Sequence, residues 1–340
     1  MTAILAKVTR GGVVESSHAG TVVVTDVAGH LHASAGDPNT FAYFRSSAKP
    51  FQAVPLIESG AADRFGITPA ELALCCASHS GEATHREQVL AMLAKIGLGV
   101  DALQCGAPLP IDDEEAGMIL AGQKPRSPLG CDCSGKHTGM LATCVHLGYP
   151  IDSYLETGHL LQQTIRGIVA EVCRVQPDRL RIATDGCSVP TFGTSVASMA
   201  VAFATLAAPL AAPAGGGREH AEALDRLRTA MTAHPENVGG SNGRLDTDLM
   251  TCSKGKLVAK GGADGLLCIG LPDHGLGIAI RVVDGSFRAH SVAVEAVLKQ
   301  LGLVDCEVVD CLMSQHEHRI LNHNGRHVGD IRAAFTLSVA

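Results

Sequence analysis

The sequence predicts an α+β fold in which strands from the N- and C-terminal parts of the chain form one antiparallel sheet flanked by helices, with a helical middle lobe. Alternating apolar and polar residues, typical of strands, occur near both ends of the chain, whereas the middle has the apolar spacing of helices. The 340 residues, 46% of them hydrophobic, can bury a large core. We expect one domain, 1–340, with an α/β lobe (about 1–60 and 250–340) and a mainly helical lobe (about 61–249).

The first strands are expected where glycine-containing turns separate short alternating segments. These predicted strands cover Val13–Glu15, Thr21–Thr25 and Leu31–Ser34. From Ser46 onward the apolar spacing becomes helical. The clearest predicted helices cover Thr84–Ile96, Gly135–Leu147, Ser153–Arg174, Thr191–Leu206 and Glu219–Ala233.

The last third of the chain returns to strand patterns before one more helix, Ser291–Leu301, and a terminal strand near Ile331–Ser338. The predicted strands before that helix cover Lys256–Ala259, Gly265–Leu271 and Gly277–Val283. A stretch rich in Pro, Ala and Gly, Ala207–Gly217, is expected to form an exposed loop.

The amino-acid composition limits the classes of molecule that the protein is expected to bind. A net charge of −7, without basic runs, disfavours nucleic acid, and the absence of Trp with only 3 Tyr disfavours stacking platforms, so we expect a small polar ligand. No apolar run reaches the roughly 18 residues of a membrane helix, and the first residues lack a signal-peptide pattern. We therefore expect a cytoplasmic protein. Its 12 cysteines are then expected to be thiols, mostly buried, with a disulfide framework as the alternative.

A Ser-x-x-Lys spacing stands at the start of a predicted helix, at Ser46 and Lys49. Side chains at positions i and i+3 share one face of a helical turn, so the lysine amine can reach the serine hydroxyl. A serine hydroxyl is a weak nucleophile unless a base lies beside it, and a lysine with a lowered pKa can be that base. The alternative is an N-cap serine followed by a surface lysine.

Two further segments repeat this chemistry. Ser78 lies in a turn of small polar residues at a helix end, and Lys260 ends a predicted strand before Gly261 and Gly262, which allow backbone N–H groups to approach a ligand. A plain helix end and a hairpin turn are the alternatives. The order of the three elements is that of serine β-lactamases and penicillin-binding proteins.

Two cysteine-containing segments supply candidate metal ligands. Thiolates from Cys133 and Cys187, aided by Lys136 or His137, could hold a soft divalent ion such as zinc, with buried free thiols as the alternative. The first segment also approaches a P-loop, but His137 stands where that loop needs Ser or Thr, which disfavours a nucleotide site.

Together, four ordered segments resemble the rhizobial-type (class 3) L-asparaginases. They are Phe44–Gln52, Ala77–Glu82, Cys133–Met140 and Asp185–Thr191. The resemblance spans nearly the whole chain and implies the fold of serine β-lactamases and glutaminases. It further implies a homodimer in which each chain is a single catalytic domain that hydrolyses L-asparagine to L-aspartate and ammonia through an acyl-enzyme.

Carried over residue by residue, the resemblance implies that Ser46 is the nucleophile with Lys49 as its base, and that Ser78 and Lys260 form a second Ser–Lys pair. Lys260 would provide positive charge near the second hydroxyl. The backbone N–H of Ser46 and one from the edge at 262–263 are candidates for the oxyanion hole.

The resemblance also implies a zinc site at Cys133, Lys136 and Cys187 with a water as fourth ligand. We expect zinc to position the substrate rather than to activate the attacking water, because a serine nucleophile is already present. A zwitterionic substrate needs a cation and an anion in its pocket. The candidates for its α-carboxylate and α-amino groups are Arg45, His137 and Asp185.

Three other functions stay open. A glutaminase is close, because one methylene separates the two substrates and is discriminated by only about 1–3 kcal/mol. A penicillin-interacting enzyme would leave the Cys–Lys–Cys set without a purpose. A zinc-dependent amino-acid-binding protein without turnover would keep its ligand affinity when Ser46 is replaced by alanine, whereas an enzyme would lose turnover.

Overall fold

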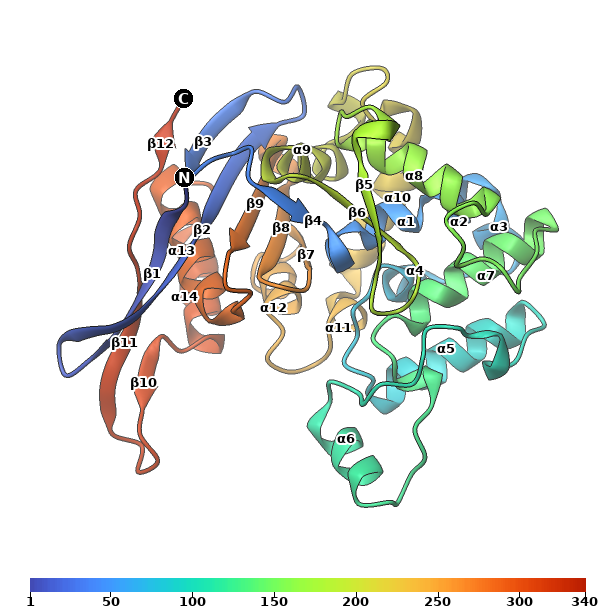
Figure 1. Cartoon of the computed structure of the whole chain (residues 1–340), viewed down its shortest axis with the longest axis horizontal. Coiled ribbons are helices and arrows are strands. Elements are labelled where there is room, and N and C mark those ends of the chain that lie inside the picture. The colour runs from blue at the N-terminus through green and yellow to red at the C-terminus, as the bar shows by residue number, and fades with distance from the viewer.

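The computed structural model describes all 340 residues and contains one large antiparallel sheet built from both ends of the chain (Figure 1). Its path is β10-β11-β1-β2-β9-β8-β7, with β3 pairing with β2 and with β12. The strands are β1 (Ala3–Arg10), β2 (Val13–Asp26), β3 (Leu31–Ala35), β7 (Val258–Gly261), β8 (Leu266–Leu271), β9 (Leu276–Val282), β10 (Arg319–Leu321), β11 (His327–Ala333) and β12 (Ser338–Val339). N- and C-terminal strands pair in three places: β1 with β11, β3 with β12, and β2 with β9, the last from Gly20 opposite Val282 to Asp26 opposite Leu276. The predicted α+β fold with a shared sheet is confirmed.

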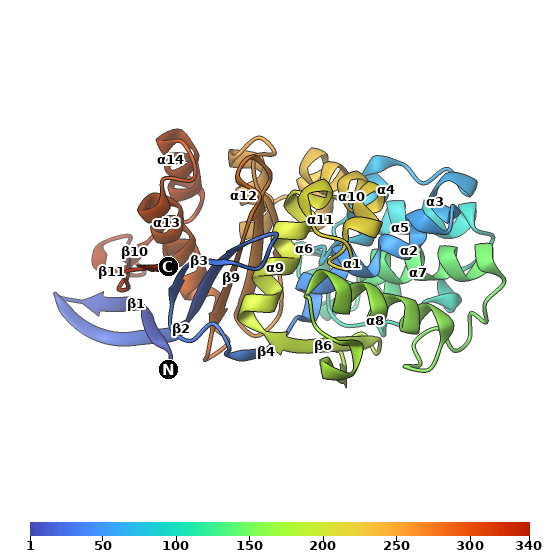
Figure 2. The same cartoon turned by 90° about the horizontal axis from the view of Figure 1, so that it is seen from above.

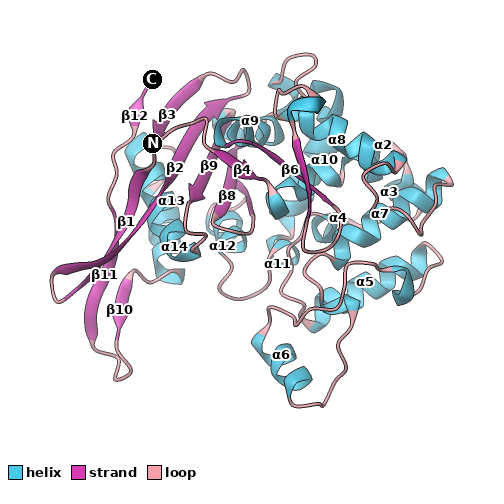
Figure 3. Ribbon diagram, in the orientation of Figure 1, coloured by secondary structure: helices cyan, strands magenta, loops and turns pink.

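Helices occupy the middle of the chain, as predicted, and most of them lie to one side of the sheet in Figure 3. They are α1 (Lys49–Gln52), α2 (Val54–Glu58), α3 (Ala61–Arg64), α4 (Pro69–Cys75), α5 (Ala83–Lys95), α6 (Asp113–Leu120), α7 (Ser134–Leu147), α8 (Leu160–Val172), α9 (Val196–Ala207), α10 (Ala221–Ala233), α11 (Pro235–Val238) and α12 (Leu245–Cys252). Two more helices, α13 (His290–Leu301) and α14 (Cys306–Gln315), follow β9. No helix has the length and apolarity needed to cross a membrane.

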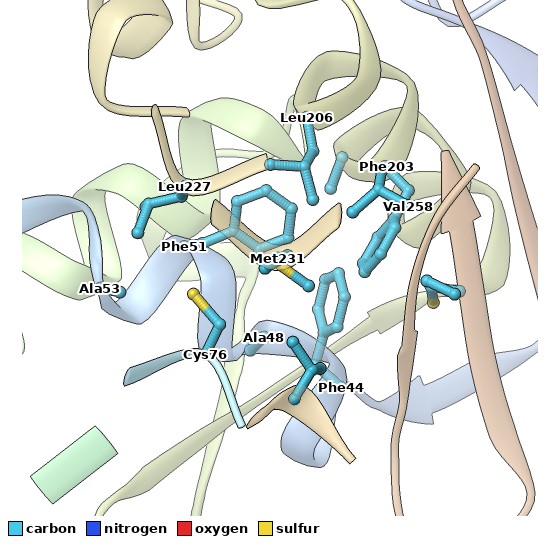
Figure 4. Packing of buried hydrophobic residues seen from close by; sticks show 14 of the residues in the cluster. Phe44, Ala48, Phe51, Ala53, Cys76, Phe203, Leu206, Leu227, Met231 and Val258 are labelled. Atoms are coloured by element: carbon cyan, nitrogen blue, oxygen red, sulfur yellow. The ribbon is translucent and has the colours of Figure 1, made fainter. Parts of the chain in front are cut away.

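Helix α9 joins the sheet to the helices, because it packs on β2, β8 and β9 (Figure 2). A Cβ atom on Gly277 of β9 would lie 2.0 Å from the carbonyl oxygen of Ala200 in α9, so the close approach requires glycine. Phe203 of α9 then meets Phe51 of α1 edge to face, with ring centroids 5.7 Å apart, and Phe44 continues the contact (Figure 4). One continuous apolar core therefore ties both parts of the chain together.

The local predictions were wrong in two places in the helical part. Residues 190–195 form strand β6 (Pro190–Ser195), which pairs with β4 (Phe41–Tyr43) and β5 (Arg181–Thr184), and the helix begins only after Ser195. The Ser195 side chain caps that helix by accepting a hydrogen bond from the Ser198 N–H. Helix α8 begins at Leu160 rather than at 153, because the His159 side chain caps it there.

At the N-terminus, the two strands predicted within 13–25 are one strand, β2, and the strand β1 before it was not predicted. Bulges interrupt the β1–β2 pairing, between Ile4 and Ala6 and between Val8 and Thr9. Each bulge shifts the alternation of inward and outward side chains, and this hides the strand from a search for period-two patterns.

The expectation of free thiols was wrong for one pair of cysteines. Cys252 of α12 and Cys311 of α14 form a disulfide across 59 positions of sequence. Of the ten free cysteines, only Cys306 is exposed, and the rest are buried as expected. The pairing depends on how α14 folds back beside α12, which the spacing of the two residues does not reveal.

Candidate active site

A cleft of about 490 Å³ lies where the edge of β7 faces the helical part of the chain. It brings together both serines that the sequence singled out, Ser46 and Ser78. Its other polar side chains are Asp132, Arg244, Asp246, His290, Ser291 and His316, and residues 261–263 line it beside them. A larger and shallower groove runs along β1 and β11, but its lining contains neither serine nor cysteine.

Ser46 lies in a 3₁₀ turn, Arg45–Ala48, directly before α1. Arg45 has φ +49°, a left-handed conformation that is costly for a non-glycine residue. Its N–H donates to Thr191 Oγ1 at 3.2 Å, and its guanidinium bonds to Asp185 at 2.6 Å, which together hold the strained turn. The Ser46 hydroxyl itself makes no hydrogen bond within the protein and faces the cleft.

Ser78 receives hydrogen bonds from both predicted lysines. The Nζ atom of Lys49 lies 2.9 Å from Ser78 Oγ, and the Nζ atom of Lys260 lies 3.0 Å from the same oxygen. Both lysine side chains are completely buried. A hydroxyl accepts two hydrogen bonds and donates one, so the proton of Ser78 is left to point toward a third group in the cleft.

The two lysines have different electrostatic surroundings. Burial lowers the pKa of Lys260 to about 8, although Asp246 opposes the shift. Burial acts in the same direction on Lys49, but the negative groups of Cys133 and Asp132 outweigh it and raise the pKa of this lysine above its ordinary value. Lys260 is therefore the lysine that gives up its charge more readily.

Arg244 and Asp246 belong to this site and were not predicted. The carboxylate of Asp246 lies 3.5 Å from Lys260 Nζ and 3.8 Å from Arg244 Nε, and it accepts the Gly261 N–H at 3.3 Å. Burial alone would raise the pKa of Asp246, but Arg244 and Lys260 lower it to about 2. The only signal in the sequence was their place directly after a glycine-rich loop at the start of a helix.

The predicted metal ligands also come together. The Nζ atom of Lys136 lies 3.0 Å from Cys187 Sγ. The Cys133 and Cys187 thiols act on each other, so that the pKa of Cys133 is lowered and that of Cys187 is raised. All three side chains are buried, and the two sulfurs raise the pKa of the Lys136 amine although burial alone would lower it. Two sulfurs and one amine within contact distance suit a soft divalent ion such as zinc, which would have to displace the lysine proton.

Comparison with known proteins places the chain in a family. The sequence profile of L-asparaginase II matches residues 6–333. The chain belongs to the L-asparaginase II family. Among curated proteins, none matches it.

Similar solved structures have low identity to this L-asparaginase II family member. A structure titled Mglu, in its native form in 4.3 M NaCl, has 16% identity and a TM-score of 0.37 over 84% of this chain. This chain covers only 60% of the length of that protein. A beta-lactamase from Mycobacterium bovis has 13% identity and a TM-score of 0.39, over 87% of this chain and 94% of its own. A Bacillus glutaminase has 14% identity and a TM-score of 0.36, over 84% and 91%.

The three residues predicted to hold the charged groups of the substrate lie outside the cleft lining of this L-asparaginase II family member. Arg45 pairs with Asp185 and with Asp264, so its charge is already neutralised. His137 is fully buried, and its Nδ1 atom lies 2.7 Å from the hydroxyl of Tyr154. Arg45 and Asp185 are thus paired with each other, whereas the buried Nε2 atom of His137 has no hydrogen-bond partner. The substrate-binding roles of the three residues stay predictions.

The structure leaves fewer candidate donors for the oxyanion hole than the sequence did. The N–H of Gly262 donates to the carbonyl of Leu266 at 2.8 Å and is not free to bind a ligand. Ala263 lines the cleft beside it. From this edge, the N–H of Ala263 is the donor that can join the N–H of Ser46.

Proposed function

We propose that the protein is an L-asparaginase that hydrolyses L-asparagine to L-aspartate and ammonia through an acyl-enzyme on Ser46. The observation that carries this proposal is the shared contact of Lys49 and Lys260 with Ser78, in the same cleft as the unpaired hydroxyl of Ser46. Amide hydrolysis needs an activated nucleophile, a route for its proton and stabilisation of the oxyanion. The residues of this cleft can meet all three requirements.

In the proposed mechanism the Oγ atom of Ser46 bonds to the amide carbon, and the carbonyl electrons move to its oxygen. The proton of Ser46 passes through the Ser78 hydroxyl to Lys49, whose neutral form is the minor one because Cys133 and Asp132 raise its pKa, and Lys260 adds positive charge beside Ser78. Lys49 then returns the proton to the departing nitrogen, so that the C–N bond breaks and ammonia leaves. Water then attacks the ester carbon and gives its proton to Lys49 through Ser78. The bond to Ser46 Oγ breaks, this oxygen takes the proton back, and L-aspartate is released.

Cys133, Lys136 and Cys187 would hold a zinc ion beside this cleft. When bound, zinc would supply positive charge that organises the pocket and positions the substrate. The proton route through Ser78 uses protein groups alone. The homodimer and the cytoplasmic location stay predictions.

The test is ammonia release from L-asparagine and from L-glutamine by the wild-type protein and by Ser46→Ala, with bound zinc measured in both. We expect turnover of asparagine that is lost in a folded, zinc-bearing Ser46→Ala variant. Ser17→Ala, which changes an exposed serine on strand β2, is the matched control and should keep full activity. Faster turnover of glutamine would favour a glutaminase. Stoichiometric zinc with no turnover of either amide would favour a binding protein.

A further inference from the structure

The charged residues around Ser78 fall into two groups, one at each of the lysines that contact its hydroxyl. In the first group, the acidic side, Lys49 contacts Asp132, and in the second group, the basic side, Lys260 contacts Asp246, which also contacts Arg244. Of these residues the two lysines are completely buried, whereas Asp132 and Arg244 are partly exposed and line the cleft. Asp132 from the first group and Arg244 from the second are therefore the charged side chains of these groups that a ligand in the cleft can reach most easily.

The basic side has two cations and only one carboxylate. Asp246, with 4% of its side chain exposed, is shared by Lys260 and Arg244. The remaining partners of Arg244 are the carbonyl of Gly239 at 2.8 Å and the hydroxyl of Ser80 at 3.3 Å, both uncharged. One positive charge on this side therefore has no anion within the protein, and a carboxylate from the cleft would complete its pairing.

A nearby carboxylate from the start of α5, that of Glu82, does not supply this missing anion. Glu82 accepts hydrogen bonds from the N–H and the hydroxyl of Ser241, both at 2.8 Å, and makes no ion pair with Arg244. Its role is to hold the glycine-rich loop that precedes Arg244. The guanidinium thus stays available to a ligand in the cleft.

On the acidic side, the carboxylate of Asp132 is only loosely paired. Its distance to Lys49 Nζ is 3.5 Å, whereas the same amine lies 2.6 Å from the carbonyl of Ala77 and 2.9 Å from Ser78 Oγ. The other contacts of this carboxylate are weak thiol hydrogen bonds from Cys131 and Cys133 at 3.8 and 3.6 Å. With 33% of its side chain exposed, Asp132 can accept strong hydrogen bonds from an ammonium group in the cleft.

We propose that Arg244 binds the α-carboxylate of the substrate and that Asp132 binds its α-ammonium group, so that the side-chain amide is held at Ser46. This inference rests on the proposed function and specifies its substrate class: a free α-amino acid that carries a side-chain amide. An asparagine within a peptide lacks both charged groups, and a simple carboxamide lacks them as well. Both should be rejected, because Arg244 and Asp132 would then remain without partners.

The experiment measures binding of three product analogues by calorimetry to the full-length wild-type protein, Arg244→Gln and Asp132→Asn. L-aspartate carries both groups, succinate lacks the amino group and β-alanine lacks the α-carboxylate. Gln at position 244 keeps a donor for the Gly239 carbonyl but removes the charge. Arg226→Gln, which breaks an ion pair with Asp63 that is remote from the cleft lining, is the matched control.

We expect Arg244→Gln to weaken L-aspartate and succinate by about 10- to 100-fold, the value of a charge-assisted hydrogen bond, and to leave β-alanine within about twofold. Asp132→Asn should weaken L-aspartate and β-alanine by a similar factor and leave succinate within about twofold. Arg244→Lys should recover part of the affinity for succinate. Thermal unfolding and zinc content should match the wild type in each variant that is compared.

An equal loss for all three analogues in either variant would overturn the inference, because it would show a purely structural role. The same holds if wild-type protein hydrolyses asparagine but binds β-alanine, succinate and L-aspartate equally well. If the wild type neither hydrolyses asparagine nor binds L-aspartate, the proposed function itself fails. The two failures are therefore distinguishable.

Discussion

The Nζ atom of Lys49 lies 2.9 Å from the Oγ atom of Ser78, and both groups are buried at the base of the cleft. Ser78 is 29 positions away in sequence, yet it is Ser78 rather than Ser46 that receives the lysine hydrogen bond. Lys260 reaches the same oxygen from strand β7. The serine at the centre of the buried charges is therefore the one suited to transfer a proton, and Ser46 is the one left exposed to a substrate.

The pH dependence of turnover tests the role of Lys260. Its pKa is lowered to about 8 by burial, so the amine is mainly charged at pH 7 and becomes neutral above pH 8. If it supplies positive charge, kcat/KM for asparagine should fall as the pH rises through about 8. A rate profile between pH 6 and 10 checks this, with thermal unfolding at each pH as the control. A rise of kcat/KM through the same range would instead identify Lys260 as a proton acceptor.

Asp246→Asn should destabilise the protein by about 3–5 kcal/mol at pH 7, because it leaves Lys260 and Arg244 without their shared carboxylate. The folded-state pKa of about 2 lies below the ordinary value of 3.8, so this stabilisation is complete above pH 4 and is lost as the pH falls through about 2. Urea unfolding of both proteins at several pH values measures the difference. A gap that does not shrink toward pH 2 would contradict the ion-pair explanation.

Gly240→Ala should disturb the loop that carries Arg244. Gly240 has φ +141°, and a Cβ atom there would lie 2.2 Å from Ser80 Oγ, which is held in place by the Gly239 carbonyl. We expect a loss of about 1–3 kcal/mol in unfolding free energy and a higher KM. Gly243→Ala is the control for backbone strain without a clash, because nothing lies within 4 Å of its added carbon. Equal costs for the two variants would rule out the steric explanation.

Cys187→Ser should remove the bound zinc, because it deletes one of the two sulfur donors. The proton route through Ser78 does not use the metal, so a folded zinc-free variant should still release ammonia, with a raised KM. Zinc content by atomic emission and initial rates give the two readouts. Cys306→Ser, at an exposed thiol, should keep its zinc and its rate. Complete loss of acylation in a folded variant would show that zinc is part of the chemistry.

Cys311→Ser should lower the free energy of unfolding by about 2–4 kcal/mol, because the disulfide to Cys252 closes a long loop in the unfolded chain. Denaturant unfolding with and without a dithiol reductant measures this loss. The reductant should affect the wild type but leave Cys311→Ser unchanged. If the wild type is equally stable under both conditions, the disulfide does not contribute to stability in solution.

The sequence alone was sufficient for the features that depend on local pattern. Alternating strands at both ends predicted the shared sheet, and the spacing of Ser46 and Lys49 and the cysteine segments pointed to residues that the structure brings into one region. These features could be predicted because the repeat of apolar residues and the spacing of a motif depend only on residues close together in the sequence. Where bulges interrupt the pattern, as in β1, the same reading failed.

Tertiary structure alone decided which charged groups face one another. Lys49 contacts Asp132 across 83 positions, and Lys260 contacts Asp246 across a loop and a helix. Neither contact can be predicted from the spacing of the residues in the sequence. Arg45 and Asp185, both attractive as substrate ligands in the sequence, pair with each other instead. The interaction between two charges depends on their distance and burial, and the number of residues between them in the sequence specifies neither. The partners of each ionised side chain therefore become known only when the two lobes are placed together.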